Sequence, residues 1–330
     1  MTRSAAFASL MATALLAIAT QGRAHAEAQD WPTRPVTMVV PFAPGGPTDL
    51  IGRFMAPRMS EVIGAQIVIE NMGGAGGMTG ASRVARAAPD GYQFVLGGLG
   101  TFVLNQLLYK KPPFDTKTAL TPVALVADQA QILITRKDFP ADNLRDFIAH
   151  AKTNPKLTYG SAGIGSASHA CNILLNSAMG TSLTHVPYRG SAPVVQDLQA
   201  GRLDFGCEQS SSALPHIQAG TIKAIAVLAR ERIPLLPELP TAREQGLLGV
   251  EAEPWFGYFL PKATPEPIVA KLHAGVIAAM NAPAVAERLQ NVGVMLVAAE
   301  RRSPDYLRDF VASEIAKWGV AIKASGVSMD

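Results

Sequence analysis

Residues 36–55, VTMVVPFAPGGPTDLIGRFM, contain the elements that decide the fold. An apolar β-type run at Val36–Val40 is followed by a break that contains Gly45 and Gly46, and then by apolar residues at helical spacing. Pro47 suits the first position of a helix, because an N–H group would have no partner there. The stretch therefore predicts a strand, a glycine turn and a helix start, the first unit of an α/β fold.

The turn after this strand has the properties of an anion site. Gly45 and Gly46 let the main chain approach a ligand, and the first N–H groups of the helix lack internal partners and lie at its positive end. The turn contains neither the Gly-Lys-Ser/Thr of a P-loop nor the three glycines of a dinucleotide fingerprint. We expect a small anion here, most simply a carboxylate. A plain tight turn that binds nothing is the alternative.

Two later strands of the first half also end in glycine. Residues 66–70 precede a run with five glycines at 71–80, and residues 93–97 precede Gly98 and Thr101. In a doubly wound sheet, ligands gather beyond the carboxyl ends of the strands. The sequence thus predicts that three glycine loops line one site.

The opening device returns in the second half. A strand at 157–159 precedes the small-residue loop 160–166, and Ser168 is placed to cap a helix. Arg189 follows the strand Thr184–Pro187 and could grip a carboxylate in bidentate fashion, or lie on the surface. Glu208 ends another strand and could meet an amine or hydroxyl of the ligand, or cap the next helix.

Residues 1–26 have the pattern of a secretory signal peptide. Arg3 precedes an apolar run at 5–19, and Ala24-His25-Ala26 fits a cleavage site after Ala26. A membrane anchor is the alternative, but this run is short, and no later stretch approaches the roughly 18 apolar residues of a span. We expect an exported protein that does not insert into the membrane after cleavage; the family resemblance described below implies the periplasm as its location.

Composition narrows the class of protein. About 300 residues remain after cleavage, enough for two domains, and 48% of the chain is hydrophobic. A net charge of +3 without a Lys/Arg cluster gives no reason to expect nucleic acid as a partner. Cys171 and Cys207 could pair after export or remain buried thiols.

Catalytic and metal-binding motifs are missing from the sequence. It contains no H-E-x-x-H, no Cys-x-x-Cys and no G-x-S-x-G elbow. Ser161 and His169 could form a serine–histidine pair, but a histidine at a helix start is more simply a hydrogen-bonding group. We therefore expect a binding protein with no catalytic residues, no cofactor and no metal.

Seven motifs together are similar to those of the tripartite tricarboxylate transporter substrate-receptor family, also called the Bug family of extracytoplasmic solute-binding proteins. The resemblance covers essentially the whole mature chain. It rests on PFAPGGPTDLIGR (41–53), ENMGGAGGMTGA (70–81), APDGY (88–92), YGSAGIGSASH (159–169), HVPYRGSAPVVQDL (185–198), LPHIQAG (214–220) and LPELPT (236–241).

This resemblance implies a type II periplasmic-binding-protein fold, with two α/β lobes that close on a ligand in the cleft between them. Residues 27–128 and 251–330 would form the first lobe, and residues 129–250 the second. The protein would act as a monomer that captures a small carboxylate and delivers it to the membrane permease of a tripartite transporter. A sensing receptor for a two-component system is the alternative, followed by a secreted hydrolase.

The resemblance also assigns ligand-binding residues. The loop after the first strand would hold a carboxylate through backbone N–H groups and ordered water, and it contributes Phe42, Ala43, Pro44, Gly45, Gly46, Thr48 and Asp49. The second lobe would close with Ser161, Ala162, Gly163, Ser166 and His169. The distal part of the ligand would meet Tyr188, Arg189 and Glu208.

Two positions depart from the family pattern. The family commonly has Asn-Arg-Pro-Gly where this chain has Asn71-Met72-Gly73-Gly74, so any contact from that arginine is absent. The acid at the strand end is usually aspartate and here is Glu208, which reaches further. The second departure leaves the identity of the ligand open.

Overall fold

The computed structural model describes residues 30–325, and the expected signal peptide lies outside them. Within that range, no single helix has the length and apolarity to cross a membrane; one helix pair, bent by 68° at residue 282, meets both criteria only when taken together.

The described chain alternates strands and helices. Its first part contains β1 (Val36–Val40), α2 (Pro47–Ile63), β2 (Ile67–Asn71), η1 (Ala75–Gly77), α3 (Met78–Ala85), β3 (Gln93–Gly98), η2 (Gly100–Leu104), α4 (Asn105–Leu108), α5 (Thr116–Ala119) and β4 (Leu120–Gln129). Its middle part contains β5 (Gln131–Arg136), α6 (Leu144–Thr153), β6 (Thr158–Ser161), α7 (Ala167–Met179), β7 (Thr184–Pro187), α8 (Ser191–Gln199), β8 (Phe205–Gln209), α9 (Ser210–Gln218) and β9 (Ile222–Val227). Its last part contains β10 (Trp255–Pro261), α10 (Glu266–Asn281), α11 (Pro283–Gln290), β11 (Val294–Leu296), η3 (Ala299–Arg301) and α12 (Pro304–Ser325).

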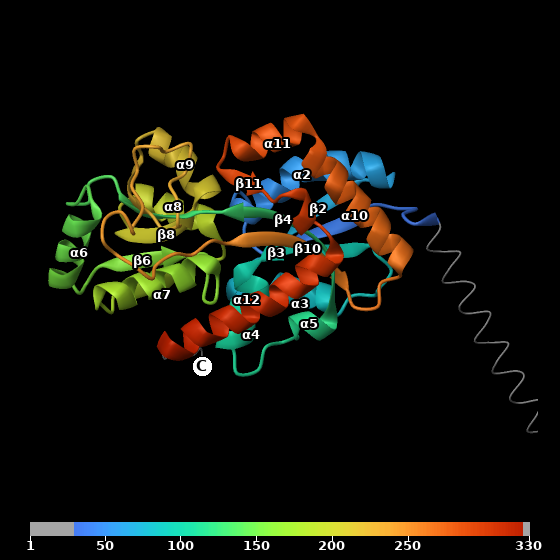
Figure 1. Cartoon of the computed structure of the whole chain (residues 1–330), viewed down its shortest axis with the longest axis horizontal. Coiled ribbons are helices and arrows are strands. Elements are labelled where there is room, and N and C mark those ends of the chain that lie inside the picture. The colour runs from blue at the N-terminus through green and yellow to red at the C-terminus, as the bar shows by residue number, and fades with distance from the viewer. Residues whose placement is uncertain (1–29, 326–330) are drawn as a thin grey trace, which may run out of the picture.

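Within residues 30–325 the strands form two sheets, each covered by helices (Figure 1). The six-stranded sheet has the order β11-β4-β10-β3-β1-β2 and belongs to what we call lobe 1. The five-stranded sheet has the order β7-β6-β8-β5-β9 and belongs to lobe 2. The expected two-lobe α/β fold of periplasmic binding proteins is confirmed.

Strand β10 ties the late part of the chain into lobe 1. It lies antiparallel between β3 and β4, with Phe256 opposite Gly98 and Trp255 opposite Asp128. Only Ala130 separates β4 from β5, so the chain passes from one sheet to the other within one residue. Crossing segments therefore lie beside the carboxyl ends of β3 and β8, where a ligand would bind.

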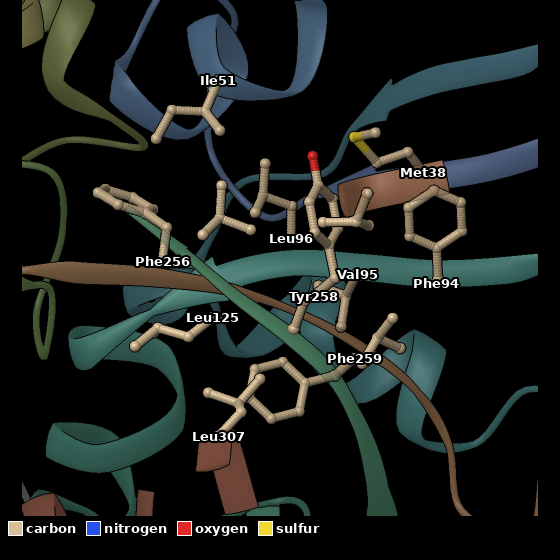
Figure 2. Packing of buried hydrophobic residues seen from close by; sticks show 14 of the residues in the cluster. Met38, Ile51, Phe94, Val95, Leu96, Leu125, Phe256, Tyr258, Phe259 and Leu307 are labelled. Carbon is tan, nitrogen blue, oxygen red and sulfur yellow. The ribbon is translucent and has the colours of Figure 1, made fainter. Parts of the chain in front are cut away.

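Both faces of the lobe 1 sheet are buried, which explains its continuous apolar strands. Every residue of β10 is buried. Figure 2 shows Tyr258 and Phe94 on the face covered by α2, and Phe259 on the opposite face near Leu307 of α12. The rings of Phe94 and Tyr258 pack edge to face with centroids 5.8 Å apart, a favourable aromatic geometry.

Helix boundaries follow the local signals in one place and depart from them in another. Helix α2 begins with Pro47 after Gly46, as predicted, and ends at Ile63, where its C-cap residue Gly64 has a left-handed φ of 81°. The expected cap at Ser168 is wrong: α7 begins at Ala167, and the Ser166 side chain accepts from the His169 N–H at 3.2 Å. Ser168 instead accepts from the Ala162 N–H at 2.9 Å.

Candidate ligand-binding site

A cavity of about 30 Å³ lies between the two lobes, with room for roughly two water molecules. Its lobe 1 wall comes from the turn after β1 and the segment after β3. Of the predicted residues, this wall contains Phe42, Gly46, Thr48, Gly98 and Thr101. The main-chain N–H groups at the start of α2 have no side-chain cap. They remain available to a ligand.

Asp49 holds this turn from behind. Its buried carboxylate accepts hydrogen bonds from the Gly45 N–H at 2.8 Å, Arg53 Nε at 2.8 Å and Asn71 Nδ2 at 2.9 Å. Burial alone would raise the pKa of Asp49, but these three hydrogen bonds together outweigh it and hold the pKa below its ordinary value. Asp49 does not line the cavity. Its carboxylate instead stabilises the conformation of the turn.

The lobe 2 wall is made by two helix starts and the end of a strand. The start of α7 and the loop before it contribute Ser166, Ser168 and Ala162. Helix α8 begins with Ser191, and its N-cap residue, Gly190, has no side chain that could cap the helix. Gln209, the last residue of β8, also lines the cavity. Pro254, Trp255 and Phe256 form the remaining side, where the chain returns to lobe 1.

Three helix N-termini thus border one cavity: those of α2, α7 and α8, helices of 17, 13 and 9 residues. Each carries partial positive charge at that end. None of the described residues that line the cavity is charged. Positive dipole ends around a neutral cavity favour a small anion such as a carboxylate.

A pair of histidines supports the lobe 2 wall from inside. The rings of His169 and His185 stack with centroids 4.2 Å apart, and His185 Nε2 lies 2.7 Å from the Ser161 hydroxyl. Burial lowers the pKa of both histidines to about 4, and for His169 the proximity of His185 adds to this. Both rings are therefore neutral at pH 7. The Gly165 N–H donates to His169 Nδ1 at 3.2 Å.

Ser161 has His185 as its hydrogen-bond partner, rather than the His169 considered from the sequence. The Ser161 side chain is 0% exposed and neither it nor either histidine lines the cavity. The hydroxyl also accepts from the Gly163 N–H at 3.2 Å. The Ser161–His185 pair therefore holds the loop that carries Ala162.

The three residues expected at the distal end of the ligand lie outside the cavity lining. Tyr188 donates its hydroxyl to Asp197 Oδ2 at 2.5 Å, and the Arg189 side chain is exposed. Glu208 is completely buried beside Ser191 and Ser212, and its Oε1 has no hydrogen-bond partner within residues 30–325. Burial raises the pKa of Glu208 to about 7.

The remaining glycine loop contacts the opposite lobe instead of lining the cavity. A Cβ on Gly76 would lie 2.2 Å from the Ile164 carbonyl oxygen, and one on Gly73 would lie 2.8 Å from that of Arg189. Nearby, the Ala43 N–H donates to the Arg189 carbonyl at 2.9 Å. Ala43, Pro44, Gly45 and Gly163 also lie outside the cavity lining. In this structure the lobes touch through backbone.

Three lining residues, Gln209, Ser191 and Trp255, were not among the predicted site residues. Gln209 directly follows the predicted Glu208, and Ser191 comes two residues after the predicted Arg189. Trp255 reaches the cavity only because β10 inserts beside β3. A helix start at Ser191 was the one signal that could have identified that residue.

Residues 51–327 match the family described as tripartite tricarboxylate transporter family receptor. The chain is similar to the periplasmic binding protein BugD, with 39% identity and a TM-score of 0.88 over 91% of this chain and 100% of that one. It is also similar to MatC from Rhodopseudomonas palustris with bound malate (41% identity, TM-score 0.86, 88% and 100% covered). A third similar structure is R. palustris Rpa4515 with adipate (36% identity, TM-score 0.85, 91% and 99% covered). As the motifs indicated, the chain belongs to the tripartite tricarboxylate transporter receptor family.

Proposed function

We propose that this protein captures a small carboxylate between its lobes and delivers it to the membrane permease of a tripartite transporter. The observation that carries this proposal is the meeting of three helix N-termini at an uncharged cavity. The bound malate and adipate of two similar proteins support the same ligand class.

Capture would proceed by closure of the lobes. The hydrogen bond from the Ala43 N–H to the Arg189 carbonyl joins the two lobes, and it would break as they separate. A ligand that contacts both walls binds the closed form better than the open form and shifts the population toward it. The permease would then receive the closed, liganded protein.

The remaining expectations belong to this proposal. The sheets support lobe boundaries near 128 and 250, since β4 ends at Gln129 and β10 begins at Trp255. The signal-peptide pattern and the family support export to the periplasm. The burial of Ser161 supports binding rather than hydrolysis.

A thermal-shift screen of the mature protein against dicarboxylates, tricarboxylates, acidic amino acids and aromatic acids tests the proposal. A ligand at 100 times its dissociation constant should add about 2.7 kcal/mol to the free energy of unfolding. A shift with one or more carboxylates, and none with the corresponding neutral amides, is the expected result. A flat response to every carboxylate, in protein refolded from denaturant to remove any copurified ligand, would contradict it.

A further inference from the structure

Two glutamine side chains lie side by side at the lobe 2 wall. Gln209 lines the cavity and ends β8, and Gln131 begins β5. The two residues are direct partners in the antiparallel pair of β5 and β8. Directly paired residues project from the same face of a sheet with their Cβ atoms roughly 5 Å apart. This face packs against α7, whose first residues also line the cavity.

These amides have hydrogen-bonding atoms that the protein leaves unused. Gln131 is 0% exposed, and neither its Nε2 nor its Oε1 has a partner among the described residues. Gln209 Oε1 and the indole Nε1 of Trp255, another lining residue, are likewise buried without a partner there. A buried polar group that stays unpaired destabilises the protein, because it has lost its hydrogen bonds to water. Two of these atoms belong to residues that line the cavity, and the other two belong to the glutamine that pairs with one of them, which indicates that their partner is a bound molecule.

The kinds of atom restrict that partner. Among the lining residues, Trp255 Nε1 is an unpaired donor and Gln209 Oε1 an unpaired acceptor. Gln131 is not part of the lining, but it pairs with Gln209 and has both an unpaired donor, Nε2, and an unpaired acceptor, Oε1. A carboxylate only accepts and an ammonium only donates, whereas a hydroxyl does both. Turning either amide exchanges its donor and acceptor but leaves both kinds on the wall. No charged side chain among the lining residues offsets an ammonium.

We propose that Gln131, Gln209 and Trp255 determine specificity by binding a hydroxyl group of the ligand, while the helix N-termini hold its carboxylate. This inference rests on the proposed function. It predicts that the receptor prefers a hydroxycarboxylate to the same acid without the hydroxyl. It also predicts a preference over the acid that carries an ammonium in its place.

Calorimetric titration of the full mature protein with matched acids tests this inference. The pairs are malate and succinate, 2-hydroxyglutarate and glutarate, and lactate and propionate, with aspartate and glutamate as the ammonium analogues. We expect at least tenfold tighter binding of the hydroxy acid in every pair that binds, because a site built for a hydroxyl leaves its own polar groups unpaired without one.

Substitution assigns the preference to these residues. Gln209→Met and Gln131→Met keep the length of the side chain and remove its hydrogen bonds. Each should lower the affinity for the hydroxy acid more than the affinity for its partner, so that the preference within the pair is lost. Gln196→Met, at an exposed position of α8, is the matched control and should change neither. Gln209 is only half-buried, so its variant remains informative if Gln131→Met fails to fold.

The outcomes separate the two proposals. Equal affinity within the pairs that bind, or a preference that survives Gln209→Met, overturns this inference and leaves carboxylate capture intact. Binding by no acid in these pairs or in the thermal-shift panel contradicts the proposed function, and this inference with it.

Discussion

The two glycine turns on the same edge of the lobe 1 sheet serve different purposes. In the turn after β1, a Cβ on Gly46 would find its nearest atoms at 3.7 Å, and the turn leads into the uncapped start of a 17-residue helix. In the loop after β2, a Cβ on Gly76 would lie 2.2 Å from a carbonyl of the other lobe. The first glycine turn leaves the N–H groups at the start of α2 without a side-chain cap, and the second permits two backbones to touch. Glycine after a strand therefore indicates close approach without saying what approaches.

The largest effect on ligand binding is expected from Gly76→Ala, which prevents the close approach of the two backbones at the loop after β2. With the lobes in contact, as in this structure, the added Cβ would lie 2.2 Å from the Ile164 carbonyl oxygen, and we expect separation of the lobes to relieve this collision. We expect ligand affinity to fall by more than tenfold by calorimetry, and small-angle scattering to show no compaction when ligand is added.

The control for this variant is Gly180→Ala. Gly180 has a similar left-handed φ, 68° against 59°, but a Cβ there meets no atom of residues 30–325 within 4 Å. Both variants therefore carry similar backbone strain. Affinity close to that of the parent protein in Gly76→Ala would show that closure does not use this contact.

Asp49→Asn should disturb the turn after β1, because the Asp49 carboxylate holds this turn in place. Asparagine lacks the negative charge of the carboxylate that accepts hydrogen bonds from the Gly45 N–H and from Arg53 Nε. Hydrogen bonds to charged groups contribute roughly 1.5–3 kcal/mol to the free energy of unfolding. Because Arg53 is half exposed, we expect urea unfolding to show a loss of free energy of unfolding near the lower end of this range. We also expect ligand affinity to be several-fold weaker.

The pKa of Asp49 is lowered, so its contribution is present above the ordinary value of 3.8 and disappears as the pH falls through the folded-state value. The difference between parent and Asp49→Asn should therefore vanish in acid. Asp309→Asn, at an exposed acid that pairs with Arg308, is the surface control. Equal effects of the two substitutions at pH 7 would contradict a role for Asp49 in shaping the turn.

Glu208→Gln tests whether the buried carboxyl beside the lobe 2 wall makes the stability of the protein depend on pH. The folded protein keeps the Glu208 proton up to a pKa of about 7, while the unfolded chain releases it near 4.5. Between these values the folded state binds more protons, so the parent loses stability as pH rises, by at most about 1.4 kcal/mol per pH unit. The variant lacks this loss, so its stability relative to the parent protein should increase from pH 4.5 to pH 7.

His169 and His185 act in the opposite direction, because their pKa values of about 4 make the folded protein less stable as the pH falls below 6.5. Both histidines remain in the variant, so their effect cancels when melting temperatures of the two proteins are subtracted. A difference that does not change with pH would show that Glu208 is ionised in the folded protein.

The smallest effect is expected from Arg189→Ala. The Arg189 side chain is exposed and does not line the cavity, while its carbonyl makes the contact between lobes. Alanine keeps that carbonyl, so affinity at physiological salt should change less than about threefold, as for most exposed charges. A loss of a hundredfold would place the guanidinium on the ligand.

The sequence predicted what local signals encode. The strand, turn and helix around Gly46 follow from apolar spacing and Pro47, and the structure reproduces them. Gln209 and Trp255 could not be found in this way, because the chain crossing and the pairing of distant strands bring them to the cavity. The cap at Ser166 instead of Ser168 shows the same limit, since both serines can cap and tertiary contacts select one.

A crystal structure of the mature protein with the carboxylate that gives the largest thermal shift tests the central claim most directly. We predict a carboxylate group between the starts of α2, α7 and α8, within hydrogen-bonding distance of main-chain N–H groups from both lobes. A carboxylate bound instead through an arginine or lysine side chain, or outside the cleft, would contradict the account.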